Sequence, residues 1–482
     1  MSAYRFNHGL RATRQLVLAA CIGLAPLVTH AGDSNVDTTF TVGGVQPGWR
    51  RAYVAGGGNA DERIVAAARA PDGGYVLAGS RAGGGAGALI FLAKFRADGS
   101  DDATFGGSAA TGNAGTGRVL KDAWLSSVTD MTIDAQGRII VVGATPGALG
   151  QSDFGVVRFK ADGSDDTSFA GDGGTGVAFD FDAANGRVND TPSSVTTSPD
   201  GSIFVAGVIQ DRMSGNATTL VGVVKLKPDG SRDEDFGSVA GGLGYFCGVQ
   251  CENVLHVARI VYDAPRDRIV VGGDHAVSAS NTDWFIFDTT SSGTTHVDSF
   301  VVDLGGASGY QLAYMTDLAV QTDGKPVALG WANDTNLKSV PVLLRRKAVG
   351  SAEDKPGFGN VTNRALMVLP WTDAIVNGLA IDSRGRFLLA GEYAPFKQGI
   401  SGRLSTSAAI DTSFNGTSSP SGYIAKTTGG QGAFRTIFKR VFLDGGRPVL
   451  VGESPDSTTG DTDLDLVVTR LQSDLIFANG LE

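Results

Sequence analysis

The sequence predicts an all-β protein that folds as a seven-bladed β-propeller with four antiparallel strands in each blade. Three observations carry this prediction. A short phrase, consisting of a Gly turn and an apolar run that ends in Gly, recurs seven times along the 482 residues. The copies are spaced by about 60 residues, and a near-constant period of this size indicates a repeat architecture. The 69 glycines, the 16 prolines and the lack of long helical periodicity favour short strands joined by turns.

The first phrase of each repeat predicts a buried strand behind a tight turn. Its apolar run is rich in β-branched residues, and the turn Gly permits a left-handed backbone conformation. Aligned on their final Gly, the turn positions are Gly73, Gly137, Gly201, Arg266, Gly324, Gly385 and Gly446. The same alignment predicts equivalent strand positions for Val76, Ile140, Phe204, Ile269, Val327, Leu388 and Val449.

A second phrase follows each first one and predicts another strand with a turn behind it. Its clearest copies are residues 94–106, 158–169 and 225–237. Charged and apolar residues alternate with period two in this phrase, as expected for a half-buried strand. One complete unit, residues 127–181, contains four strand-like segments, which is the content of one propeller blade.

The paired phrases resemble the delta-60 repeat of bacterial secreted and surface proteins. The resemblance rests on the three copies of the second phrase given above, with residues 411–414 as a partial copy. It implies a β-propeller, and it implies no activity and no catalytic residues. The fourth repeat departs from the pattern, because Arg266 replaces the turn Gly and Ser292-Gly293 replaces Asp-Gly at the second turn.

The two ends of the chain predict export and closure of the ring. Residues 1–31 have a basic start, an apolar stretch and a small-residue cleavage site, so we expect a signal peptide. A lipoprotein signal at Cys21 is the alternative. Residues 36–40 look like the D-x-x-F end that the last repeat lacks, so pairing of the terminal segments should close residues 32–482 into one propeller domain. Residues 474–482 are expected to pack on the last blade, or to serve as a recognition tail.

Charge and cysteine content restrict the partners and the compartment. A net charge of −10 argues against nucleic acid and against anionic membrane surfaces. No segment after the leader is long and apolar enough for a membrane span, so we expect an exported monomer in the periplasm, at the cell surface or outside the cell. Cys247 and Cys251 predict a disulfide in an oxidising compartment. Free thiols, or half of a metal site with His256, are the alternatives.

The Asp-rich second turns are the strongest candidates for chemistry. Residues 98–102 and 162–166 resemble fragments of calcium loops, since closely spaced carboxylates can hold a hard cation. A structural calcium ion is one interpretation. Recurrence at a fixed place in successive repeats favours the other, in which Asp and Ser side chains satisfy turn amides. The acidic segment 461–465 has the same two interpretations.

No residue is assigned as catalytic, as a metal ligand or as a cofactor ligand. The sequence contains no nucleophile elbow, no zinc-protease helix and no phosphate loop. We therefore expect a scaffold that binds an unknown protein or glycan ligand where loops converge at one mouth of the channel. A surface-structural or adhesive protein is one alternative. A secreted carbohydrate-active enzyme with carboxylates at that mouth is the other.

Overall fold

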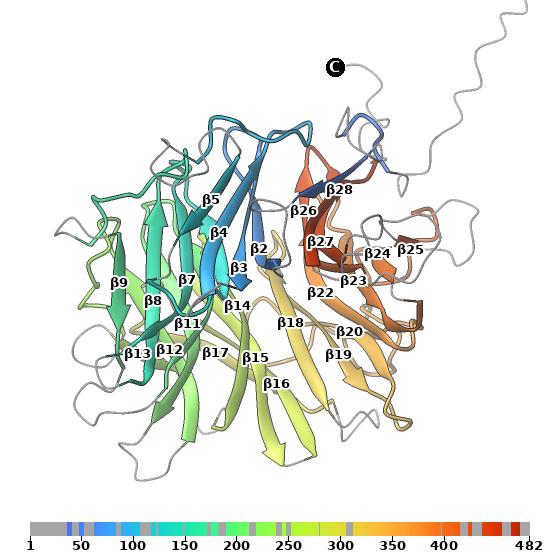
Figure 1. Ribbon diagram of the computed structural model, residues 1–482. Helices are drawn as coiled ribbons and strands as arrows, with labels where there is room; N and C mark the ends of the chain where they lie inside the picture. The colour runs from blue at the N-terminus through green and yellow to red at the C-terminus, as the bar shows by residue number, and fades with distance from the viewer. Residues whose placement is uncertain are drawn as a thin grey trace, which may run out of the picture. The chain divides into compact units, whose positions relative to one another are not determined.

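The computed structural model confirms seven antiparallel four-stranded sheets, the blades of a β-propeller (Figure 1). The first strand of each blade contacts the first strand of the next, and β26 contacts β2, so the ring is closed. The structure describes residues 36–40, 48–52, 62–82, 88–106, 117–121, 124–147, 150–170, 175–181, 189–211, 218–237, 243–246, 252–278, 280–304, 312–396, 398–414, 423–426, 436–455 and 464–472.

The strands of the first four blades follow one another in chain order. Blade 1 contains β2 (Glu62–Arg69), β3 (Tyr75–Ala82), β4 (Ala88–Phe95) and β5 (Arg118–Lys121). Blade 2 contains β6 (Asp130–Ile133), β7 (Ile139–Pro146), β8 (Ser152–Phe159) and β9 (Gly176–Phe179). Blade 3 contains β10 (Thr191–Thr197), β11 (Ile203–Asp211), β12 (Thr218–Leu226) and β13 (Leu243–Phe246). Blade 4 contains β14 (Val254–Asp263), β15 (Arg268–Ser278), β16 (Asn281–Thr290) and β17 (His296–Val302), with a 3-10 turn at Ala264–Arg266.

The remaining blades include the one that joins the two ends of the chain. Blade 5 contains β18 (Ala313–Val320), β19 (Pro326–Asn333), β20 (Ser339–Arg345) and β21 (Leu366–Val368). Blade 6 contains β22 (Ala374–Ile381), β23 (Phe387–Tyr393), β24 (Gln398–Leu404) and β25 (Tyr423–Lys426), with a 3-10 turn at Ala394–Phe396. Blade 7 contains β26 (Ile437–Asp444), β27 (Arg447–Pro455), β28 (Leu464–Arg470) and, as its outer strand, β1 (Trp49–Ala52).

An apolar core lies between every two neighbouring blades. Strand β7 shows why the second strands are apolar without alternation. Ile139 and Val141 belong to the core shared with blade 1, whereas Ile140 and Val142 belong to the core shared with blade 3. Both faces of such a strand are buried, so its sequence is a continuous apolar run.

The first turn of each repeat has the predicted form in five blades. Five residues join the first and second strands, and the fourth of them is a Gly at φ between +78 and +87°. This region of backbone space is unfavourable for residues with a Cβ atom, which explains the recurring Gly. These turn glycines are Gly73, Gly137, Gly201, Gly324 and Gly385.

In blade 4, the turn and the strand after it lie one residue later in the sequence than the repeat alignment predicts. Four residues separate the paired Asp263 and Arg268, and the left-handed residue is Asp267 at φ 47°. The turn position is therefore Asp267 and not Arg266. Because the turn is one residue longer, Val270 occupies the position that the repeat alignment gave to Ile269, and Val270 pairs with Asp288.

A basic residue near the end of the third strand binds an Asp of the following turn in six blades. This clamp holds the second turn against its own strand, and the Arg or Lys head also lies over a buried Phe in all six of them. The pairs are Lys94–Asp102 at 3.3 Å, Arg158–Asp166 at 2.7 Å, Lys225–Asp233 at 3.0 Å, Arg345–Asp354 at 2.8 Å, Arg403–Asp411 at 2.7 Å and Arg470–Asp37 at 2.9 Å.

The second turns also join neighbouring blades. The amide of Gly106 in blade 1 donates to the carbonyl of Asp162 in blade 2 at 2.9 Å, and Ala170 donates to Asp229 in blade 3 at 3.0 Å. Even the degraded turn of blade 4 keeps this bond, since Gly237 donates to Ser292 at 2.9 Å. The recurring Asp-Gly phrase is thus an inter-blade joint.

The predicted closure of the ring by the terminal segments is confirmed. Strand β1 pairs antiparallel with β28, from Trp49 opposite Thr469 to Ala52 opposite Leu466. Asp37 supplies the clamp acid of blade 7, because its amide donates to the carbonyl of Arg470 at 2.8 Å and its Oδ2 accepts from Arg470 Nε at 2.9 Å. The N-terminal segment therefore completes a repeat that the C-terminal end leaves unfinished.

Candidate functional site

Several predicted features lie outside the described residues. These are the signal peptide 1–31, both cysteines of the predicted disulfide, Cys247 and Cys251, and the tail 474–482. They stay predictions. No helix among the described residues is long and apolar enough to cross a membrane.

The Asp-rich turns use their carboxylates to stabilise the fold. Asp98 Oδ1 accepts from the amide and the hydroxyl of Ser100 at 2.9 and 2.6 Å, and Asp162 binds Ser164 in the same way. The last Asp of each phrase, Asp102 or Asp166, forms the clamp described above. Within the described residues, no group of three or more His, Cys, Asp or Glu is placed to hold a metal ion. A structural calcium ion stays a prediction that these contacts do not support.

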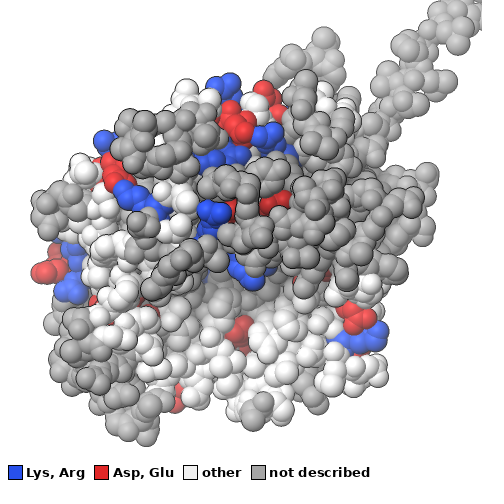
Figure 2. Space-filling model, viewed as in Figure 1, with Lys and Arg blue, Asp and Glu red and all other residues white. Residues whose placement is uncertain are grey.

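Acidic and basic side chains lie close together on the face of the molecule in Figure 2. Ion pairs among the described residues include Lys338 with Asp373, at 2.8 Å, in which both side chains are partly exposed. Exposed pairs of this kind contribute about 0–1 kcal/mol each to stability.

The inner wall of the ring carries charged residues that the sequence had not singled out. The first strands of six blades contain a β-bulge, and such irregularities re-aim the side chains beside them. The residues that follow the bulges in blades 4, 5 and 7 are Arg259, Asp317 and Arg440. Asp130 holds the corresponding position in blade 2, where it pairs with Val142, the residue before Gly143.

Arg259 of blade 4 forms ion pairs with acids of two other blades. Its Nε donates to Asp317 Oδ1 in blade 5 at 2.9 Å, and its Nη1 donates to Asp130 Oδ2 in blade 2 at 3.1 Å. Burial would lower the pKa of this guanidinium, but the carboxylates of Asp317 and Asp130 outweigh burial and raise it. Arg259 is therefore a permanent cation with both neighbouring acids as partners.

Both acids also accept backbone amides of the next blade. Asp130 Oδ2 accepts from Ser194 Oγ at 2.7 Å and from the amide of Val195 at 3.1 Å. Asp317 Oδ2 accepts from the amide of Leu379 at 2.8 Å. These bonds satisfy amides of the first strands, so the two carboxylates belong to the architecture of the ring.

Arg440 differs from Arg259 because it has no acid partner among the described residues. Its Nη1 donates to the carbonyl of Lys439 at 3.2 Å, while its Nε is buried and bonds to no acceptor. Burial and the charge of Arg259 lower its pKa, and Asp130 and Asp317 partly offset this. A cavity of about 240 Å³ lies beside Arg440.

Five blades line this channel cavity. Its charged wall is formed by Arg440, Arg259 and Asp130, and Thr132 and Thr196 add hydroxyls. Ala67, Ala68, Met131, Val195, Ile260 and Val261 also border the cavity, and the side chains of Met131, Val195 and Ile260 are buried in the cores between blades.

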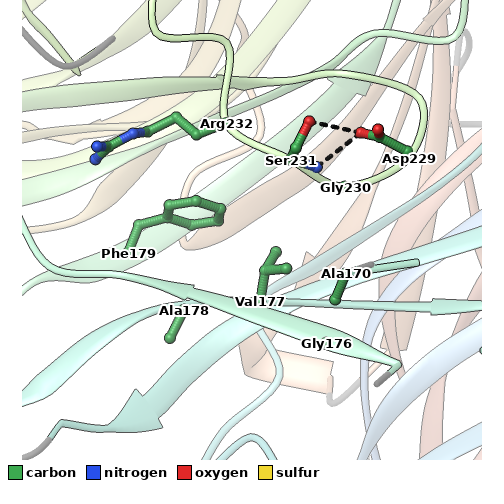
Figure 3. Close-up of a pocket in the computed structure, with 9 residues that line it drawn as sticks. All are labelled: Ala170, Gly176, Val177, Ala178, Phe179, Asp229, Gly230, Ser231 and Arg232. Carbon is green, nitrogen blue, oxygen red and sulfur yellow. Dashed lines mark hydrogen bonds between the residues drawn. The ribbon is translucent and has the colours of Figure 1, made fainter. Parts of the chain in front are cut away.

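A second hollow lies at the outer side of blades 2 and 3 (Figure 3). Strand β9 forms one wall and the turn from Asp229 to Arg232 forms the other, around a volume of about 380 Å³. Asp229 Oδ1 accepts from the amide and hydroxyl of Ser231 at 2.9 and 2.7 Å, as the dashed lines show. Two of the three polar side chains drawn here, Asp229 and Ser231, therefore bond each other, and the hollow is the weaker candidate site.

A buried carboxyl and a histidine lie together on the first two strands of blade 4. Asp274 on β15 is fully buried, and its Oδ1 is 4.0 Å from Nδ1 of His256, whose side chain is 51% exposed. Asp274 Oδ1 accepts from the amide of Met315 at 3.2 Å, whereas its Oδ2 has no partner. Burial raises the pKa of Asp274 to about 7, against the lowering effect of the Met315 amide.

Replacing Asp274 with Asn is expected to stabilise the protein at alkaline pH. The folded pKa of about 7 exceeds the ordinary value of 3.8, so the free energy of unfolding falls as pH rises through this interval. Asn keeps the acceptor for Met315 and cannot ionise. We expect a gain of about 2–4 kcal/mol at pH 8 that nearly disappears at pH 4, measured by urea unfolding at both values.

Glu453→Gln is the matched control for this substitution. Glu453 has the corresponding position in blade 7 and accepts from the amide of Ile64 at 2.8 Å, but Lys439 Nζ lies 3.9 Å from it. Removing its charge should therefore give no gain at pH 8. An Asp274→Asn protein that is equally stable to the native one at both pH values would contradict the prediction.

A family model described as a domain of unknown function (DUF5122) beta-propeller matches residues 136–169 and 198–236. The match supports a propeller repeat in blades 2 and 3, where the two phrases are best preserved. The narrower identification as a delta-60 repeat stays a prediction. No curated protein matches the chain.

Solved structures similar to this chain include a protein of unknown function from Dyadobacter fermentans DSM 18053, with 14% identity over 71% of this chain and 93% of that chain and a TM-score of 0.38. The polysaccharide lyase Uly1 has 11% identity over 86% and 90%, with a TM-score of 0.47. A GH93 α-L-arabinofuranosidase of Fusarium graminearum has 12% identity over 70% and 91%, with a TM-score of 0.40. At this similarity, they say nothing about the ligand of this protein.

Proposed function

We propose that this protein is an exported binding scaffold whose central channel holds a small ligand. The observation that carries the proposal is the channel cavity of about 240 Å³, where Arg440 has no acid partner among the described residues and Thr132 and Thr196 supply hydroxyls. Five blades contribute to its wall. A ligand there would bridge blades and stabilise the closed ring, since anything that binds only the folded state raises its stability.

The hydrogen bonds of the channel acids favour binding over catalysis. An enzyme that works with paired carboxylates needs one carboxyl group free to donate a proton and one free to act as base or nucleophile. Asp130 and Asp317 already bind Arg259 and amides of the next blades. The channel therefore offers a ligand cationic and hydroxyl donors rather than a carboxylate pair.

One observation favours a secreted carbohydrate-active enzyme as the second candidate. Asp274 has a pKa of about 7, which suits a general acid at neutral pH, and His256 beside it is half-exposed. Against this, the Asp274 side chain is fully buried and bonded to the amide of Met315. A substrate could meet His256 but not the carboxyl group itself.

A ligand screen on the purified protein tests the scaffold. Small organic acids, amines, neutral sugars, oligosaccharides and short peptides are added singly, thermal shift reports binding, and mass spectrometry reports turnover. We expect stabilisation by a small ligand without any product. Product formation from an oligosaccharide would instead support the enzyme, and no shift with any compound would favour a surface-structural or adhesive role.

Two matched variants locate the binding site. Ala67→Leu places extra volume in the channel cavity and should abolish the shift. Val177→Phe adds volume on β9, where Val177 points into the outer hollow (Figure 3), and should leave the shift unchanged. The reverse pattern would move the site to the outer hollow and refute the channel.

A further inference from the structure

Two aromatic side chains stack on each other in blade 5. Tyr314 on β18 pairs with Trp331 on β19, and their ring centroids are 4.5 Å apart with 30° between the ring planes. Both residues are partly exposed, whereas Trp49, Trp284 and Trp371 are buried. The backbones of Tyr314 and Trp331 are paired in the sheet, so their exposed area belongs mainly to the side chains. These two rings, the aromatic pair, therefore offer surface that a ligand can contact.

The polar atoms of the aromatic pair are not used by the fold. Tyr314 Oη and Trp331 Nε1 form no hydrogen bond within the described residues. The hydroxyl of Tyr75, by contrast, donates to Asp444 at 2.7 Å, as is usual for a Tyr in a core. The aromatic pair thus combines ring surface with one O–H that donates and accepts and one N–H that donates.

His256 of blade 4 lies beside the aromatic pair. It holds the same place in β14 as Tyr314 does in β18, two residues before the bulge of a first strand. The amide of Met315, the residue after Tyr314, donates to Asp274 Oδ1 at 3.2 Å, and the same oxygen lies 4.0 Å from His256 Nδ1. The half-exposed imidazole adds, in its neutral form, one donor and one acceptor to this end of the ring.

A neutral sugar matches these groups. A pyranose ring has a face of C–H groups, which packs on the negative face of an aromatic ring, and an edge of hydroxyls that both donate and accept. The aromatic pair carries no charge. Asp274, the acid beside His256, is fully buried and bonded to the Met315 amide, so it cannot serve as the counter-ion of a cationic ligand.

We infer that the aromatic pair and His256 bind a neutral glycan, with one sugar ring on Tyr314 or Trp331 and its hydroxyls toward His256. The site lies on the other side of the first-strand bulges from the channel cavity, and the three residues are not among those that line that cavity. It is therefore a second site, beyond the proposed small-ligand function and independent of it.

Native gel electrophoresis through gels that contain a soluble polysaccharide tests the inference. The probes are barley β-glucan, soluble starch, galactomannan and arabinoxylan, one in each gel. We expect at least one of them to retard the protein in proportion to its concentration, and high salt should leave the retardation unchanged. Trp331→Ala should weaken the binding about tenfold or more, and Tyr314→Phe and His256→Ala should weaken it several-fold.

Two further variants keep the result interpretable. Trp331→Phe keeps an aromatic ring on Tyr314, so it should retain the melting temperature and most of the binding even if Trp331→Ala is destabilised. Trp124→Ala removes the other exposed tryptophan, which is 42% exposed and lies beside Gly176 of β9, and it should bind normally. Ala67→Leu, which fills the channel cavity, should also bind normally.

The absence of retardation by every polysaccharide would overturn the inference, and so would equal retardation of Trp331→Ala and the native protein. Binding that is lost in Trp124→Ala and kept in Trp331→Ala would place the glycan on blade 2 instead. Calorimetric binding of choline without retardation by any polysaccharide would assign the aromatic pair to a quaternary ammonium cation. None of these outcomes decides the channel proposal, which depends on the small-ligand shift and its loss in Ala67→Leu.

Discussion

Deleting residues 32–50, with the leader retained, is expected to lower the melting temperature by about 10 °C or more, or to prevent folding. The deletion removes Phe40 and Trp49, which are both buried, and leaves β28 without the partner strand β1. Burial of two such aromatic side chains contributes about 1.5–3 kcal/mol each, and an unpaired inner strand edge invites pairing with other chains. Calorimetric melting and size-exclusion chromatography measure both effects.

Asp37→Ala separates the clamp from the loss of the strand. Arg470 Nε donates to Asp37 Oδ2 at 2.9 Å in a buried pair, and Arg447 Nη1 donates to the same oxygen at 3.1 Å. Removing one member of a buried pair costs about 3–5 kcal/mol. Asp444 also lies 3.1 Å from Arg470 Nη1, so the lower end of that range is expected.

Asp98→Ala is the control for Asp37→Ala, because Asp98 is exposed and binds its own turn through Ser100. Its loss should cost about 1 kcal/mol. If Asp37→Ala and the deletion both melt like Asp98→Ala, the N-terminal segment does not close the ring energetically.

Acid should weaken the same closure. Burial would raise the pKa of Asp37, but hydrogen bonds from Thr39 and the charges of Arg470 and Arg447 lower it below the ordinary value of 3.8. An acid with a lowered folded pKa contributes stability that is present above the unfolded pKa and is lost as pH falls through the folded pKa. The difference between the native protein and Asp37→Ala should therefore shrink below about pH 4.

The repeat architecture could be predicted from the sequence because each blade needs the same local chemistry. A Gly with positive φ, a strand buried on both faces and an Asp two residues before a Ser each leave a mark in the chain. Closure was visible for the same reason, since Asp37 and Phe40 repeat the end of a phrase. In blade 4 the sequence alignment points to Arg266 rather than Asp267, because the turn there is one residue longer than in the other repeats.

The channel residues could not be predicted in the same way. Asp130, Ser194, Arg259, Asp317 and Arg440 hold equivalent positions in the first strands and yet differ in chemical type. A repeat signature depends on sameness, so a position that varies from blade to blade carries no signal by itself. An alignment of the first strands on their bulges shows a charged residue at the same strand position in several blades. Such an alignment needs the structure, because a bulge shifts the spacing by one residue and is recognised only from the strand pairing.

Substitutions of Asp288 in blade 4 are expected to have the second large effect on stability. In the other six blades, the third strand has Lys or Arg at the position that Asp288 occupies in blade 4. Asp288 pairs with Val270, as Lys94 pairs with Val76 and Arg158 with Ile140. Here Arg268, on the second strand, takes over the role of the missing base. It binds Asp263 at 2.9 Å and reaches the carbonyl of Ala348 in blade 5 at 2.9 Å.

In blade 4, the basic residue therefore lies on the second strand and the acid, Asp288, on the third, and Asp288 stabilises this arrangement. Asp288 is fully buried and forms ion pairs with Arg268 and with Arg346 of blade 5, the latter at 2.6 Å. Asp288→Asn leaves both guanidinium groups without this charge and should cost about 3–5 kcal/mol. Restoring the residue type of the other blades, as Asp288→Arg, should be worse, because it buries a third cation beside two others.

We expect Asp288→Arg to give no folded protein in the soluble fraction, although it brings blade 4 closer to the repeat pattern. The double variant Asp288→Arg with Arg346→Asp exchanges the charges across the seam between blades 4 and 5, and it should recover part of the soluble yield and of the melting temperature. Arg345→Asp in place of Arg346→Asp is the matched control, because Arg345 pairs with Asp354 at 2.8 Å and not with Asp288. An Asp288→Arg protein that melts like the native one would show that the pattern of the repeat, and not the local charge balance, determines which residue this position accepts.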